Sequence, residues 1–137
     1  MTIPAYCTIG DVEAHTGKGY TGKTNPSRTR VQLIIQTVSQ ELNGALQAAG
    51  YTLPVSSAAT DALEMLRGYA ALGGAYRAWY AATRGSTVFP AAASWREDYL
   101  MALKGLREDL IALPGIDPED GGTEQFTGLI RSVKLTG

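Results

Sequence analysis

The chain has 137 residues, of which 45% are hydrophobic, and it carries a formal net charge of −1. This size fits one domain with one core, and the hydrophobic content excludes wholesale disorder. A near-neutral charge is not typical of a protein that binds nucleic acid over its whole surface, so any contact with DNA requires a local basic patch. The single cysteine, Cys7, excludes an internal disulfide bond.

No part of the sequence predicts a contact with a membrane. The first residues lack the basic segment and apolar run of a signal peptide. The longest apolar stretch, residues 70–82, contains Arg77 and is too short to cross a bilayer. We therefore expect synthesis in the cytoplasm.

A short first helix is predicted by the capping-box spacing of Thr8 and Asp11. This helix should cover about residues 9–15 and end at Gly17. Residues 17–25 consist of Gly, Lys, Thr and Asn around one Tyr, a composition that predicts a mobile loop.

The second helix should begin with Asn25 as its N-cap and Pro26 at its first position, and Gly50 should end it. One helical stripe of apolar residues predicts its buried face. The members of the stripe are Val31, Ile34, Ile35, Val38, Leu42, Ala45, Leu46 and Ala49. Leu33 lies off this stripe, which makes it a candidate contact with a partner.

The third helix should run from about Thr60 to Thr83, with large apolar and aromatic residues separated by small ones. Gly73 and Gly74 cost roughly 1 kcal/mol each relative to alanine in the middle of a helix. Close approach of another backbone is the usual compensation. We expect this helix either to form the centre of a bundle or to pack its small-residue face against a neighbouring subunit.

The fourth helix should start at a second capping box, Ser94 to Glu97, and end at Pro114-Gly115. Its outer face is charged. Its predicted buried stripe consists of Trp95, Tyr99, Ala102, Leu103, Leu106, Leu110 and Leu113. The predicted fold is therefore all-α, a small bundle of about four helices over residues 1–115 with an extended C-terminal arm over residues 116–137.

The end of the arm is apolar and prone to extended structure, and it has no partner strand in its own chain. We expect it to pair with another molecule or to stay mobile, and its apolar residues are candidate contacts with a partner. These residues are Leu129, Ile130, Val133 and Leu135.

Residues 17–24 match the P-loop pattern G-x-x-x-x-G-K-T letter for letter. A P-loop must follow a buried strand and open a helix whose N-terminus faces the phosphates. Here the preceding residues are polar and helix-like, and Pro26 delays the next helix. We interpret the match as accidental.

Four basic residues form a local cluster in this region: Lys18, Lys23, Arg28 and Arg30. They fit either a solvated loop or a set of contacts with channel DNA or with acidic groups of a partner. Contacts with phosphates would be independent of sequence and weakened by salt.

No constellation in the chain predicts catalysis, a metal or a cofactor. His15 lacks the Cys or carboxylate partners that a metal site needs, and Cys7 has no adjacent base. The acidic residues Glu97, Asp98 and Glu108 fit a charged outer face better than an acid/base pair. We expect a protein that is not an enzyme.

Over about residues 5–113, the order of elements resembles the head–tail connector, or adaptor, proteins of tailed bacteriophages. The similar features are a Tyr/Thr-containing segment before a short helix (Tyr6 to Val12), a longer helix with an Ile-rich start, and the Tyr-x-x-Pro turn from Tyr51 to Pro54. An Ala/Tyr-rich helix and a last helix with an aromatic near its start, Trp95, follow. The glycine-rich loop 17–25 and the arm depart from the family pattern.

The resemblance implies a virion protein of the neck region, made in the cytoplasm of the host bacterium. Such a protein would form a homo-oligomeric ring, typically twelvefold. It would dock below the portal and extend the DNA channel toward the tail or head-closure protein. The resemblance makes Leu33 and the apolar residues of the arm candidate contacts with the portal or a neighbouring subunit. The alternative is a small helical interaction or regulatory protein that binds nucleic acid through the basic loop 17–30; a nucleotide-using enzyme is a third reading.

Overall fold

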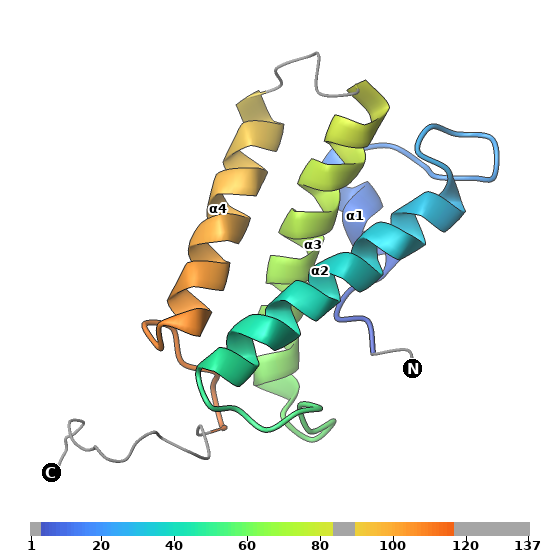
Figure 1. Cartoon of the computed structure of the whole chain (residues 1–137). Coiled ribbons are helices and arrows are strands. Elements are labelled where there is room, and N and C mark those ends of the chain that lie inside the picture. Colours follow the sequence, from blue (N-terminus) through green and yellow to red (C-terminus); the bar gives the residue numbers. More distant parts are fainter. Residues whose placement is uncertain (1–3, 84–89, 117–137) are drawn as a thin grey trace, which may run out of the picture.

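The computed structural model describes residues 4–83 and 90–116 of the chain (Figure 1). These residues form four helices, α1 (Ile9–Thr16), α2 (Arg28–Ala48), α3 (Thr60–Thr83) and α4 (Pro90–Arg107). The described segments contain no strand, so the fold is the all-α bundle that the hydrophobic periodicity predicts. Among these residues, no helix combines the length and the hydropathy that crossing a bilayer requires.

Helix α1 has the predicted start and stop. The hydroxyl of Thr8 accepts a hydrogen bond from Asp11 N, and the Asp11 carboxylate accepts one from Thr8 N, which completes the capping box. The helix ends at Gly17, whose φ of 71° lies in the left-handed region that favours glycine.

Helix α2 begins later than predicted. Its N-cap is Ser27, whose hydroxyl accepts from Arg30 N at 3.2 Å, so Asn25 and Pro26 precede the helix and the predicted cap at Asn25 is wrong. Arg28 N instead donates to Thr21 O across a turn, which holds the preceding segment out of the helix. The apolar stripe is buried as predicted, apart from the half-buried Ala49 that forms the C-cap.

Helix α3 has the predicted bounds and lies at the centre of the bundle, where it contacts each of the other three helices. Figure 1 shows α3 beside α4, with α2 crossing obliquely and the short α1 behind. A Cβ atom on Gly73 would lie 2.7 Å from the Tyr99 ring, and one on Gly74 would lie 2.8 Å from a methyl group of Val12. Side chains take the space at both glycines, so the expected approach of a second backbone is wrong, whereas the predicted central position of this helix is confirmed. At these two glycines the small-residue face is buried inside the chain and is not available to another subunit.

Helix α4 starts at Pro90, so Ser94 lies within the helix and the predicted capping box is wrong. Proline is favoured in the first turn because its missing N–H is not needed there. The helix also ends before Leu113, because Asp109 adopts a left-handed φ of 58°. Leu110 N then donates to Gly105 O, and the side chain of Leu110 is 75% exposed, so its predicted burial is wrong.

The Tyr-x-x-Pro turn after α2 contacts the segment that follows α4. Tyr51 is buried, and its hydroxyl accepts a hydrogen bond from Leu113 N at 3.0 Å. Leu113 is buried even though it lies outside α4. Ile116, the last described residue, packs partly buried against the core.

Candidate interaction surfaces

The glycine-rich loop after α1 is anchored to that helix by a buried aromatic residue. Tyr20 is only 4% exposed. Its backbone N donates to the Glu13 carboxylate at 2.8 Å, and its hydroxyl donates to the Thr16 hydroxyl at 3.0 Å. Composition predicts only a mobile loop around this tyrosine, whereas in the structure its burial holds the loop against the bundle.

The P-loop match at residues 17–24 does not have P-loop geometry. The segment follows α1 rather than a strand, and α2 starts only at Arg28. The hydroxyl of Thr24, which would hold magnesium in a P-loop, accepts from Thr21 N and donates to Pro26 O at 2.8 Å. Thr24 thus closes a turn of its own segment, and Lys23 lies exposed within that turn.

The predicted basic residues are all exposed, namely Lys18, Lys23, Arg28 and Arg30. Lys18 Nζ lies 4.9 Å from the centroid of the Trp79 ring, so this lysine leans onto the end of α3. Arg28 lines a different feature, a recess of about 450 Å³ beside Cys7 and Gln32. Within residues 4–83 and 90–116, none of the four cations forms an ion pair. They are therefore free to contact phosphates or carboxylates of a partner.

The predicted contact residue of α2 is exposed. Leu33 has 59% of its surface accessible, in agreement with its position off the apolar stripe. Its neighbours one turn away, Arg30 and Thr37, are also exposed. The hydroxyl of Thr37 donates to Leu33 O, so this face offers one apolar side chain within a polar surface.

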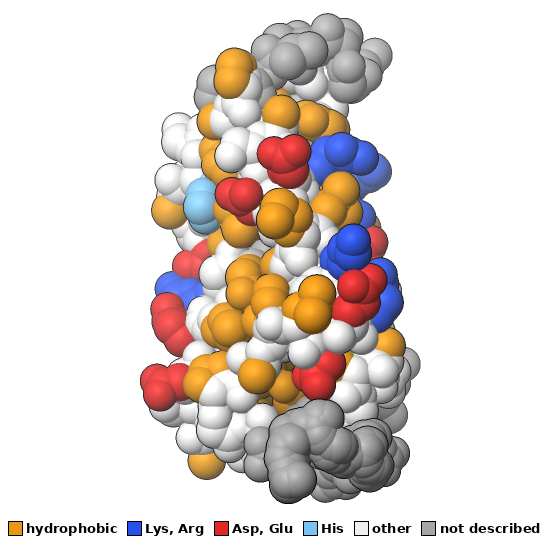
Figure 2. All heavy atoms as spheres, turned by 90° about the vertical axis from the view of Figure 1, so that its left-hand side faces the viewer, with side chains coloured by type: hydrophobic (Ala, Val, Ile, Leu, Met, Phe, Trp, Pro, Cys, Tyr) orange, Lys and Arg blue, Asp and Glu red, His pale blue; other side chains and the backbone are white. Residues whose placement is uncertain are grey.

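A second apolar surface lies on α4, outside the candidate contacts predicted above. Leu100 is 40% exposed and Met101 is 66% exposed. Both line a shallow recess of about 750 Å³, together with Ala93, Glu97 and Lys104 among others. Figure 2 looks onto this side of the molecule and shows hydrophobic side chains gathered between acidic and basic ones. The signal that could have found the recess is the pair of large apolar residues directly after Tyr99, off the buried stripe.

A polar network links α2, α3 and α4 inside the bundle. Arg77 Nη2 lies 2.7 Å from Glu41 Oε2, and the Tyr99 hydroxyl donates to Glu41 Oε1 at 2.7 Å. Arg77 Nε donates to the Tyr76 hydroxyl at 3.1 Å. Burial raises the pKa of the Tyr99 hydroxyl, and the Glu41 carboxylate raises it further. Burial lowers the pKa of Arg77, but its contacts with Glu41 and the two tyrosines outweigh this, so its pKa is raised overall. The network serves the fold, because the charges of Arg77 and Glu41 offset each other within it. The buried Arg77 Nη1 has no hydrogen-bond partner among the described residues.

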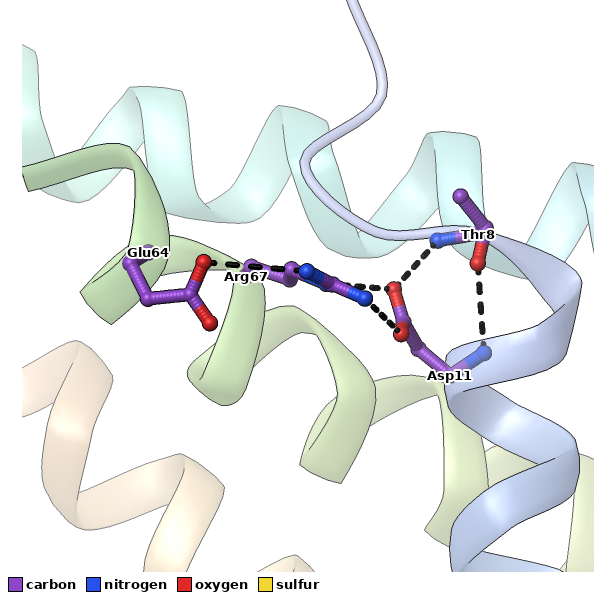
Figure 3. Close-up of polar contacts among 4 residues, drawn as sticks. All are labelled: Thr8, Asp11, Glu64 and Arg67. Carbon is purple, nitrogen blue, oxygen red and sulfur yellow. Dashed lines mark hydrogen bonds and ion pairs between the residues drawn. The ribbon is translucent and has the colours of Figure 1, made fainter. Parts of the chain in front are cut away.

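A second ion pair fixes α1 against α3, as Figure 3 shows. Arg67 Nη2 lies 2.8 Å from Asp11 Oδ1, and Arg67 Nε donates to Asp11 Oδ2 at 3.0 Å. The hydrogen bond from Arg67, followed by those from Thr8, lowers the pKa of Asp11 to about 2 despite some burial. Glu64 lies 3.6 Å from Arg67 on the solvent side. A bidentate pair of this kind orients helices and is not a reactive site.

The remaining chemistry-bearing residues do not converge. Cys7 is buried, and that burial raises the pKa of its thiol to about 12, so the reactive thiolate is scarce at neutral pH. His15 is exposed and meets the Trp95 ring edge-on at 5.8 Å between centroids. In the described part of the chain, no three residues of the types His, Cys, Asp and Glu cluster as metal ligands.

The predicted arm contacts, Leu129, Ile130, Val133 and Leu135, lie outside the described residues. The candidate interaction surfaces among the described residues are therefore the basic loop, the α2 face around Leu33 and the recess on α4. A scan against models of known protein families, a search of curated proteins and a search of solved structures each gave no significant match.

Proposed function

We propose that the protein is a head–tail connector, or adaptor, subunit of a tailed phage. It forms a ring that docks below the portal and extends the DNA channel toward the tail or head-closure protein. The proposed location is the neck of the virion.

One observation supports this proposal above the others. A small bundle exposes large apolar side chains on two different helices, Leu33 on α2 and the pair Leu100 and Met101 on α4, besides Leu110 in the segment after α4. Cyclic rings require two different and complementary faces on each subunit, whereas a two-fold dimer requires only one face that complements itself. The exposed cations of the loop would then face the channel or the next ring, where weak phosphate contacts let DNA pass.

Electron microscopy of the purified chain, alone and with the portal protein of the same phage, tests the proposal. We expect closed rings, or a ring of added density below the portal. A matched readout is antibody labelling of intact particles, which should mark the neck. A chain that stays monomeric and does not bind the portal would contradict the proposal.

The exposed, unpaired cations of the loop also support the alternative, a small interaction or regulatory protein that binds nucleic acid through residues 17–30. Its test is binding of the isolated chain to duplex DNA at several salt concentrations. If the alternative holds, the chain should bind DNA tightly and its affinity should depend steeply on salt. Both the affinity and the salt dependence should decrease when the four basic residues are changed to glutamine. If the protein is a connector subunit, the free chain should bind duplex DNA only weakly.

A further inference from the structure

The recess on α4 has the features of an interface pocket. It is bordered by Leu100 and Met101, which are the most exposed apolar side chains of that helix. Polar and charged groups surround the apolar part, namely Ser94, Arg96, Glu97 and Lys104. An apolar centre with a charged rim is the usual anatomy of a protein contact.

Leu33 is a suitable occupant of that recess. A single exposed leucine needs no explanation by itself. Here, however, an isolated apolar side chain on α2 matches an isolated apolar recess on α4 in the same molecule. We infer that the α4 recess is filled by Leu33 of a second copy of this chain.

The charges of the two helices agree with one register. In a parallel alignment that places Leu33 against Leu100 and Met101, Arg30 lies opposite Glu97, since both charges precede the apolar residues by three positions. The same register places the Thr37 hydroxyl opposite Lys104. Neither Arg30 nor Glu97 has an ion-pair partner within the described residues, so both charges can pair across the contact.

The two surfaces are separated within one subunit. Figure 1 shows the N-terminal half of α2 on the side of the bundle away from α4. One molecule therefore cannot fill its own recess, and two molecules need not close on each other. The contact is head-to-tail and repeats around a ring. This inference deepens the proposed function by naming the ring interface, and it rests on that proposal.

Cysteine cross-linking tests the contact directly. In a Cys7→Ala background, Leu33→Cys and Met101→Cys are made separately and together and then oxidised mildly. We expect each single variant to stay uncrosslinked, the mixture of the two to give a covalent dimer, and the double variant to give a ladder. Gln47→Cys, exposed on the same helix outside the register, is the matched control and should not cross-link to Met101→Cys.

A charge exchange gives an independent measurement. Arg30→Glu should weaken self-association by about threefold per contact, as expected for an exposed ion pair, and the double variant Arg30→Glu/Glu97→Arg should restore it. Circular dichroism establishes that each variant is folded. Native mass spectrometry measures the oligomer, so loss of assembly is separated from loss of fold.

The outcomes separate this inference from the proposed function. If the unmodified chain forms rings but Leu33→Cys and Met101→Cys do not cross-link, the interface is elsewhere and the connector proposal stands. If Met101→Cys alone gives dimers, the α4 recesses of two molecules face each other, and the inference is wrong. If neither the free chain nor its mixture with the portal assembles, both proposals fail.

Discussion

At the scale of single residues, the hydroxyl of Tyr99 is the buried group on which the α2–α4 contact depends. Tyr99 is fully buried, and its ring also fills the space left by Gly73. Its hydroxyl donates to Glu41 Oε1 at 2.7 Å, and Glu41 in turn pairs with Arg77. Removing one member of such a network leaves the others partly unsatisfied, which costs more than the bond itself.

Tyr99→Phe should therefore destabilise the fold by about 1–2 kcal/mol without changing the helices. The measurement is urea unfolding followed by circular dichroism. Tyr69→Phe is the matched control, because Tyr69 is half-buried and its hydroxyl forms no hydrogen bond among the described residues. Equal stability of the Tyr99 variant and the parent would show that the Glu41 contact is not maintained in solution.

Asp11 makes the stability depend on pH. Its folded pKa of about 2 lies below the unfolded value of about 3.9, so Asp11 stabilises the fold above the unfolded pKa. This contribution is lost as the pH falls from about 5 toward 2. Because the Arg67 side chain is half exposed, solvent screening limits the contribution to about 1 kcal/mol.

Asp11→Asn should accordingly cost about 1 kcal/mol at pH 7 and progressively less as the pH approaches 2. Thermal unfolding at a series of pH values measures the difference. Glu64→Gln is the control, since Glu64 is 73% exposed and lies 3.6 Å from Arg67, and it should change little. A pH-independent difference would mean that the carboxylate charge is not the cause.

At the scale of the elements, three glycines of α3 differ only in what surrounds them. A Cβ atom on Gly73 or Gly74 would enter occupied space at 2.7–2.8 Å, whereas nothing lies within 4 Å of one on Gly68. Alanine is the better helix former by about 1 kcal/mol at every position. Whether a Gly→Ala substitution raises or lowers the free energy of unfolding therefore depends on the packing around the glycine.

Gly73→Ala and Gly74→Ala should destabilise by roughly 1–3 kcal/mol, while Gly68→Ala should stabilise by up to about 1 kcal/mol. Thermal unfolding of the three variants is a direct comparison within one helix. If all three are stabilised, α3 does not pack against Tyr99 and Val12 as described.

The bounds of α3 could be predicted because its alternation of large and small residues continues to Thr83. The start of α4 could not, because Ser94 to Glu97 has the letters of a capping box, while Pro90 and the alanines after it carry no polar signal. The end of α4 depends on Ile111 folding back over Gly105, a tertiary contact that no local pattern encodes. Helix propensity and capping patterns therefore locate an element better than they locate its ends.

The exposure of Leu33 follows from periodicity and was predictable, as was that of the basic loop residues. The ion pairs were not, because Glu41 and Arg77 or Asp11 and Arg67 lie far apart in the sequence and meet only through helix packing. The burial of Tyr20 was missed for a similar reason: composition predicts a loop but not its anchor. The exposure of side chains along one helix could thus be predicted from the sequence, whereas ion pairs between helices could not.

At the scale of the whole molecule, the last buried residue of the described core is Leu113, just before the predicted C-terminal arm. The last side chains that pack on it are the buried Leu113 and the partly buried Ile116. Leu113 is held through its backbone by the Tyr51 hydroxyl. The side chains of the described core therefore come from the helical bundle, and we predict that folding does not require the arm.

Deleting residues 117–137 should leave the thermal unfolding temperature nearly unchanged, because the buried apolar residues of the described core all lie at or before Leu113. The same deletion should abolish or greatly weaken docking to the portal, since the arm's apolar residues, Leu129, Ile130, Val133 and Leu135, are then absent. A matched full-length variant with these four residues changed to serine should lose docking to the same degree, which separates side-chain contacts from chain length. Co-sedimentation with the portal and calorimetric unfolding give the two readouts. A truncated chain that unfolds would place part of the core in the arm, and one that docks with parental affinity would move the portal contact to the helical bundle.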